Sequence, residues 1–241
     1  MEGVILAIET SGETGGAAVL RAGQVLADFS VSAAKKHGGE ITHCVDRAMA
    51  VAKLERGAID VVVANCGPGS YTGLRIGLTT AITLSYALDR PAVGVPCFDV
   101  MATHYSLSGD LDMRYKGELW PVLDARRDEV MTAKFMYDKG VLERVGGDEL
   151  INPAEFGKKA APGSIVFGSG IAPYIDVFKT QPVKLGPDVF NLSASSLALQ
   201  AYRQLLNVAG HDKIERRLIE PRYFRRVLAK TTAQRAAENA P

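Results

Sequence analysis

The sequence of 241 residues predicts an α/β protein whose two halves follow one plan. Apolar residues first recur in the short runs that β-strands need and then at helical spacing, which indicates strands alternating with helices. Both halves open with three strands joined by short turns, the pattern of an antiparallel meander. Hydrophobic residues make up 47% and charged residues 23%, which is ordinary for a globular protein and excludes a disordered chain.

The first half is expected to open with three strands. Residues 4–9 (VILAIE) form an apolar run that ends on an acid, which is typical of a buried strand. The glycines and small hydroxyl residues that follow suit a tight turn. Residues 17–21 and 24–31 read as the next two strands, with Ala22-Gly23 as the turn between them.

Beyond these strands, from about Gly39 to Leu54, the spacing of apolar residues becomes helical. The stripe consists of Ile41, Val45, Ala48 and Ala52, widened by Cys44 and Met49. Residues 61–65 (VVVAN) then read as a buried strand, residues 74–88 as a second helix and residues 92–95 as a short strand. The resulting order, βββαβαβ, predicts right-handed parallel crossovers added to an antiparallel hairpin edge.

The second half repeats this opening. Three further strands are expected at residues 118–125, 129–137 and 141–145. A helix start at Asn152-Pro153, a strand over 164–168 and a long helix from Ser193 follow. We therefore expect a duplicated architecture, with a first lobe at 1–106, a more degenerate second lobe at 107–227 and a basic, mobile tail at 228–241.

A glycine-rich loop, CGPGSYTG at residues 66–73, lies between the strand 61–65 and the second helix. Backbone N–H groups at the start of a helix favour a phosphate or carboxylate, so the loop is a candidate anion site. The candidate contacts for an anion or nucleotide are Glu9, Thr10, Ser11, Gly67, Gly69 and Ser70. The loop lacks the GKS or GKT ending of a P-loop, and a plain strand-to-helix turn explains it equally well.

Small residues four apart form a ridge on the second helix. A ridge of this kind lets another helix approach closely. A glycine inside a helix costs about 1 kcal/mol relative to alanine, so Gly77 needs a reason. Packing within the chain and contact with a partner are equally good reasons. The candidate partner interface combines both helices and consists of Ile41, Val45, Ala48, Met49, Gly73, Gly77, Ala81 and Leu84.

The sequence shows no catalytic constellation, and we predict neither a catalytic residue nor a metal site. His37 and His43 are six residues apart, so the first helix lacks the spacing of a metal-binding face. Ser70 lies outside any GxSxG elbow and has no obvious His and Asp partners. The three cysteines form no CxxC pair, which argues against a zinc knuckle and a disulfide framework.

Charge and hydropathy limit the partners. Lys plus Arg number 28 against 27 for Asp plus Glu, so no overall field draws the chain to nucleic acid or membrane. Only residues 213–235 are distinctly basic, either as a solvated tail or as a contact for RNA phosphate or an acidic partner. No apolar run approaches the ~18 residues of a membrane span, and the first residues lack the basic region of a signal peptide. We expect a cytoplasmic protein.

Five segments, in order along nearly the whole chain, resemble the TsaB (YeaZ-type) family. They are ILAIETS, CGPGSYTGLRIGL, PAVGVPCFDVMA, PVLDARRDEV and EPRYFRR. The resemblance implies an actin-like (ASKHA, ribonuclease H-like) fold of two related lobes. It also implies a role in making N6-threonylcarbamoyladenosine, the modification beside the anticodon of tRNA. Glu9 stands where the family usually has Asp.

The same resemblance implies an accessory role. The protein would be the non-catalytic, activating partner of a TsaD-like paralogue, joined by a TsaE-like ATPase. TsaD-type proteins carry paired histidines on the first helix for a metal, and this helix lacks them. The first lobe's helices would contact the TsaD-like protein, and the same surface can pair with a second copy. The resemblance implies no cofactor, with a nucleotide at a shared interface left open, and tRNA reached indirectly or through the basic C-terminal segment.

Two other functions stay open. A small-molecule kinase of the same fold class would need the glycine-rich loop and Glu9 to bind nucleotide with Mg2+. A metallopeptidase, the older glycoprotease reading, would need metal ligands that the sequence does not supply. Nucleotide binding by the isolated chain tests the first of these, and metal content tests the second.

Overall fold

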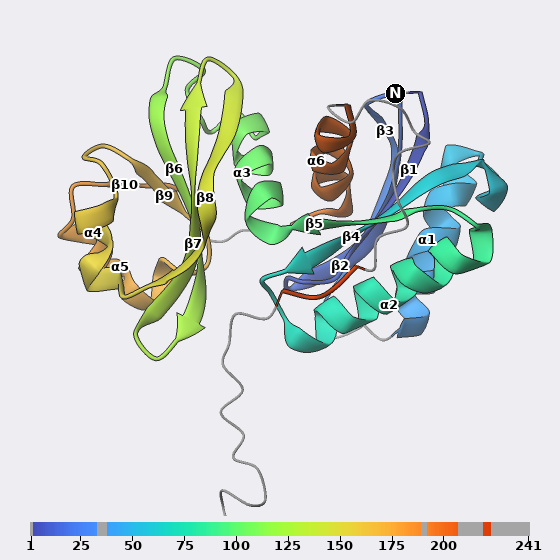
Figure 1. Ribbon diagram of the computed structural model, residues 1–241, viewed down its shortest axis with the longest axis horizontal. Coiled ribbons are helices and arrows are strands. Elements are labelled where there is room, and N and C mark those ends of the chain that lie inside the picture. Colours follow the sequence, from blue (N-terminus) through green and yellow to red (C-terminus); the bar gives the residue numbers. More distant parts are fainter. Residues whose placement is uncertain (1, 33–37, 189–191, 207–218, 223–241) are drawn as a thin grey trace, which may run out of the picture.

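The computed structural model describes residues 2–32, 38–188, 192–206 and 219–222, and its strands form two five-stranded sheets (Figure 1). The first-half elements are β1 (Val4–Glu9), β2 (Thr14–Arg21), β3 (Gln24–Ser32), α1 (Gly38–Ala52), the 3-10 turn η2 (Arg56–Ala58), β4 (Ile59–Gly67), α2 (Tyr71–Leu88), β5 (Ala92–Pro96) and α3 (Cys97–Leu107). The second-half elements are β6 (Lys116–Arg126), β7 (Glu129–Asp138), β8 (Val141–Ile151), η3 (Pro153–Glu155), α4 (Phe156–Lys159), β9 (Ile165–Phe167), η4 (Ala172–Tyr174), α5 (Ile175–Lys179), β10 (Lys184–Leu185) and α6 (Ala194–Leu206).

The two sheets have the same topology. The first runs β3-β2-β1-β4-β5, and the second, read in the same direction, runs β8-β7-β6-β9-β10. In each sheet the first three strands are antiparallel and the last two join the central strand in parallel. The second sheet is the more degenerate, because β9 and β10 have only 3 and 2 residues. The predicted duplication is confirmed.

The first sheet is buried on both faces, because alternate residues of each strand point to opposite sides. On β1, Val4, Leu6 and Ile8 pack against α1 and α2, whereas Ile5 and Ala7 face α3 and α6. Figure 1 shows the two pairs of helices on opposite sides of the sheet. This double burial explains why β1 and β4 are continuous apolar runs in the sequence.

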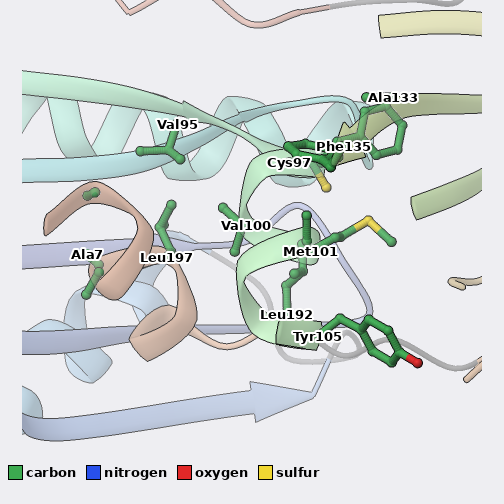
Figure 2. Close-up of a cluster of buried hydrophobic side chains, with 14 of the residues drawn as sticks. Ala7, Val95, Cys97, Val100, Met101, Tyr105, Ala133, Phe135, Leu192 and Leu197 are labelled. Carbon is green, nitrogen blue, oxygen red and sulfur yellow. The ribbon is translucent and has the colours of Figure 1, made fainter. Parts of the chain in front are cut away.

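Helix α3 joins the two sheets into one core. Its Val100 and Met101 are buried in a cluster that includes Ala7 of the first sheet and Phe135 of the second (Figure 2). The other face of the second sheet is covered by α4 and α5, where the ring of Phe156 lies 5.2 Å from that of Trp120 and 5.4 Å from that of Phe178.

Helix α6 packs on the first sheet, against β1, β2 and β3, although it follows the second sheet in sequence. The expected second lobe, 107–227, therefore contains a helix that covers the first lobe. The expected boundaries otherwise stay a prediction. The tail at 228–241 lies outside the described residues, as do His37 and His211.

Candidate functional site

The candidate anion site lies where β1 and β4 end side by side in the first sheet. Ile8 pairs with Ala64, so the next residue of each strand, Glu9 on β1 and Asn65 on β4, lies at the same edge. The structure thereby brings Glu9, Thr10 and Ser11 next to Asn65. All four side chains are buried, with exposures of 0 to 5%. A buried carboxylate needs donors around it, and the neighbours supply them.

The Glu9 carboxylate accepts hydrogen bonds at both oxygens. The Ser11 amide and hydroxyl each donate to Oε1 at 2.6 Å, and the Asn65 side-chain amide donates to Oε2 at 2.8 Å. Asn65 Nδ2 also lies 2.9 Å from Ser11 Oγ, while its Oδ1 accepts from the Gly67 amide at 2.8 Å. The network fastens the end of β1 to the end of β4.

The glycine-rich loop is fastened to the same strand end. The Ser70 amide donates to the Ser11 carbonyl at 2.8 Å. The Thr10 hydroxyl donates to the Gly73 carbonyl at 2.7 Å, and Ser70 Oγ caps α2 by accepting from the Gly73 amide at 3.2 Å. Gly69 and Ser70 are exposed, and both contact Ser11, whose amide and hydroxyl donate to Glu9. These contacts favour the turn interpretation over the anion interpretation, and contact with an anion stays a prediction.

Two buried thiols flank this network and have little nucleophilic character. Burial raises the pKa of Cys97, and it raises the pKa of Cys66 to about 11. A thiol with so high a pKa is protonated at neutral pH and is a poor nucleophile. Among the residues that the structure describes, no three His, Cys, Asp or Glu side chains are grouped to hold a metal ion.

The predicted interface residues face inward, which favours packing within the chain as the reason for the small ridge, and their contact with a partner stays a prediction. Seven of the eight are buried, and Leu84 is half-buried against the same core. A methyl group at Gly73 would overlap the Thr10 carbonyl oxygen, and one at Gly77 would overlap Thr10 Oγ1. The close approach that these glycines permit is therefore between α2 and the end of β1, within the chain.

The outward face of α2 carries a different stripe. Tyr71, Ile82 and Tyr86 are 54, 40 and 85% exposed, and Val51 on α1 is 55% exposed. The Arg75 guanidinium lies 4.2 Å from the centre of the Tyr71 ring. Positions 71, 75, 82 and 86 fall within about 60° on a helical wheel, so their spacing could have revealed this stripe in the sequence. None of these four residues was among the predicted interface residues.

Comparisons with known proteins agree with this architecture. The family model described as "TsaD: tRNA N6-adenosine threonylcarbamoyltransferase" matches residues 31–239. The "tRNA threonylcarbamoyladenosine biosynthesis protein TsaB" of Bacillus subtilis is 34% identical over 152 residues, which are 63% of this chain and 63% of that protein. A "tRNA N6-adenosine threonylcarbamoyltransferase" of Cyanothece is 33% identical over 106 residues, 38% of this chain and 31% of that protein.

Solved structures share the fold. One described as "YeaZ from Pseudomonas aeruginosa" aligns with a TM-score of 0.70 at 23% identity, covering 92% of this chain and 99% of that one. Another from the same organism, with similarity to peptidase YEAZ, aligns with a TM-score of 0.73 over 92% of this chain and 100% of that one. The likeness confirms the expected fold of two lobes. In the part of the chain that the structure describes, no helix is long and apolar enough to cross a membrane.

Proposed function

We propose a function from the premise that this chain belongs to the TsaD family and, within it, to the TsaB (YeaZ-type) proteins. The protein takes part in the modification of tRNA to N6-threonylcarbamoyladenosine. Its role is that of an accessory subunit, which activates a TsaD-like catalytic protein and works with a TsaE-like ATPase. It acts without a cofactor of its own and reaches tRNA through its partner.

The observation that carries the accessory role is the network at Glu9. In a kinase of this fold class, the acid at the end of the first strand would have to help bind the nucleotide together with Mg2+. Here both oxygens of the Glu9 carboxylate accept hydrogen bonds from the chain, and the side chain is fully buried. The strand end therefore serves as a structural junction that holds the start of α2.

The junction supports a surface role for α2. A helix whose N-terminus is fixed to β1 presents a rigid outer face, and the exposed aromatic and apolar side chains of that face suit a protein partner. Tyr71, Arg75, Ile82 and Tyr86 are the contacts that we assign to the TsaD-like protein. A second copy of this chain could use the same face when the partner is absent.

Activity measurements test the accessory role. The purified chain alone is expected neither to hydrolyse ATP nor to modify tRNA, and its addition to the TsaD-like and TsaE-like proteins should switch on modification. ATP turnover by the isolated chain that Glu9→Ala abolishes would replace this proposal with the kinase. Modification of tRNA by the isolated chain would make it an enzyme.

Binding measurements test the surface. The double variant Ile82→Ala and Tyr86→Ala should bind the TsaD-like protein at least tenfold more weakly, a loss of about 1.4 kcal/mol, because it removes exposed anchors. Its melting temperature should match that of the wild type, since neither side chain is buried. Val141→Ala, which truncates a side chain 68% exposed on β8, is the matched control and should leave affinity unchanged. Unaltered affinity in the double variant would remove α2 from the interface.

A further inference from the structure

Residues 219–222 (IEPR) form a short segment that touches both lobes. Ile219 is 6% exposed and belongs to the core between the first sheet and its helices α1 and α2. Its Cγ2 atom lies 2.7 Å from where a Cβ of Gly94 would be, and the same point is 3.4 Å from the Cys66 Sγ atom. A glycine at position 94 thus makes the notch that admits Ile219 beside Cys66.

The backbone of the segment also binds the first lobe. The Arg222 amide donates a hydrogen bond to the Cys66 carbonyl at 2.7 Å. The Arg222 carbonyl oxygen lies 2.9 Å from where a Cβ of Gly67 would be, and Gly67 has a φ of +102°, which other residues rarely adopt. Gly67 therefore leaves room for Arg222 to lie over the end of β4.

The side chain of Arg222 reaches the second lobe. Its Nη1 lies 3.7 Å from Oδ2 of Asp148 on β8, whose side chain is only 2% exposed. The same Asp148 pairs with Arg144, which also pairs with Asp99 on α3. Two guanidinium groups thus neutralise the two carboxylates that lie between the lobes. Without Arg222, Arg144 would be the ion-pair partner of both Asp99 and Asp148.

We propose that Cys66, Gly67, Gly94 and Asp148 together form a docking site for residues 219–222, which bind it reversibly as a latch between the lobes. This inference is independent of the proposed function. The described attachments are few: one apolar anchor, one backbone hydrogen bond, and an ion pair whose arginine side chain is 50% exposed. An ion pair that exposed holds weakly, so the segment can leave while the two sheets keep their shared core.

The thiol of Cys66 reports on the latch, because Ile219 and Arg222 lie over it and the residue is 5% exposed. The experiment measures how fast a small maleimide modifies each native cysteine of the full chain at pH 8, by mass spectrometry of its peptides. Ile219→Ser and Arg222→Ala should each raise the rate at Cys66 at least tenfold. The rate at Cys44, which lies on α1 and is 4% exposed, should not change.

Loss of the Arg222 charge would by itself slow the modification of Cys66, which is the opposite of the predicted change in rate. Burial is the main cause that raises the Cys66 pKa, and the charge of Arg222 lowers it. Removing that charge would leave less thiolate and would slow the reaction. A faster reaction in Arg222→Ala therefore reports exposure of the thiol rather than its ionisation.

The link between the lobes is tested from the second lobe. The charge of Asp148 also raises the pKa of Cys66, so its loss alone would speed the reaction by ionising more of the thiol. The rate is therefore compared per thiolate, from its dependence on pH. On that scale Asp148→Asn should still speed modification of Cys66, although it changes a residue on β8. Its matched control is Glu149→Gln, an exposed neighbour paired with Lys159. Glu220→Ala, an exposed position in the segment itself, should behave like the wild type.

Each other outcome overturns the latch. Unchanged Cys66 rates in Ile219→Ser and Arg222→Ala would mean that the segment does not cover the thiol. An effect of these two variants without one of Asp148→Asn would mean that the segment binds one lobe only. An equal rise at Cys44 would mean that the whole fold loosens and that no local docking site exists.

Discussion

A single carboxylate, Glu118, ties three parts of the second lobe together. It lies on β6 and is 9% exposed. Its donors are Lys134 Nζ, Trp120 Nε1 at 2.9 Å, the Ala161 amide at 3.0 Å and Ser164 Oγ at 3.1 Å. Burial acts to raise the pKa of this carboxyl, but the hydrogen bonds outweigh burial and lower the pKa to about 2. The folded state therefore stabilises the ionised form of Glu118.

Glu118→Gln should lower the free energy of unfolding at pH 7 by about 3 kcal/mol, at about 1.4 kcal/mol for each unit by which folding lowers the pKa from 4.5. Because the folded pKa is the lower one, this stabilisation is complete above about pH 4.5 and is lost as the pH falls toward 2. Urea unfolding at pH 7 and pH 3 measures it. Glu143→Gln, at an exposed site on β8, is the control. If Glu118→Gln lowered the free energy of unfolding by the same amount at pH 7 and at pH 3, the prediction would be contradicted.

The sequence identified Glu9 as a candidate site residue, but it did not identify Asn65. Glu9, Thr10 and Ser11 adjoin one another in the chain, so a shared site could be proposed from their order alone. Asn65 lies 56 residues from Glu9 and meets it only because β4 pairs with β1 in a fixed register. No local pattern marks such a partner. The same reason hid the contact between Thr10 and Gly73, which decides what the small ridge is for.

At the scale of elements, α2 carries two stripes of residues with different roles. Its small residues approach the end of β1, and its large exposed residues face outward. The inner stripe sets how closely the helix lies on the sheet. The outer stripe is then free to vary in shape without changing the fold.

Gly77→Ala should destabilise the protein by about 1–3 kcal/mol, because its methyl group would overlap Thr10 Oγ1, which is already bonded to Gly73. Thermal unfolding should show a fall of several degrees, at about 2–4 °C for each kcal/mol in a chain of this size. Gly39→Ala on α1, where nothing lies within 4 Å of the added carbon, is the control. Gly77→Leu should lose more stability than Gly77→Ala. A stable Gly77→Leu variant that bound its partner poorly would restore the interface interpretation.

The helices α1 and α6 were predictable because their apolar residues recur at helical spacing, and β1 and β4 because they are short apolar runs bounded by turn residues. The two-residue strand β10 was not predicted. The helix α3 was not predicted. Its sequence, CFDVMATHYSL, is apolar around most of its circumference, and eight of its residues are buried. A helix enclosed between two sheets has no solvated face and so shows no helical stripe in the sequence.

For the whole molecule, the repeated topology makes two similar sheets, but the chain does not make two separable halves. The first sheet needs α6 over Ile5, Ala7 and Leu20, and α3 supplies one core to both sheets. Duplication could be predicted from the repeated three-strand opening. The return of α6 could not, because an amphipathic helix does not indicate which of two apolar sheet faces it will cover.

A fragment of residues 1–106 should fail to unfold cooperatively, because it lacks α6 and ends within α3. Urea titration followed by circular dichroism, together with binding of a hydrophobic dye, measures this. A chain of residues 1–222, which keeps every described element, should unfold like the full protein. Cooperative unfolding of the 1–106 fragment would show that the first lobe is an independent domain.

The position of α6 also bears on how the protein is made. A ribosome releases the strands of the first sheet early, but the helix that covers one of its faces ends at Leu206. At roughly 5–20 residues per second, synthesis of residues 107–206 takes about 5–20 s. For that time the nascent first sheet carries an uncovered apolar face while the second lobe emerges, and this face is open to chaperones and to aggregation until α6 can cover it.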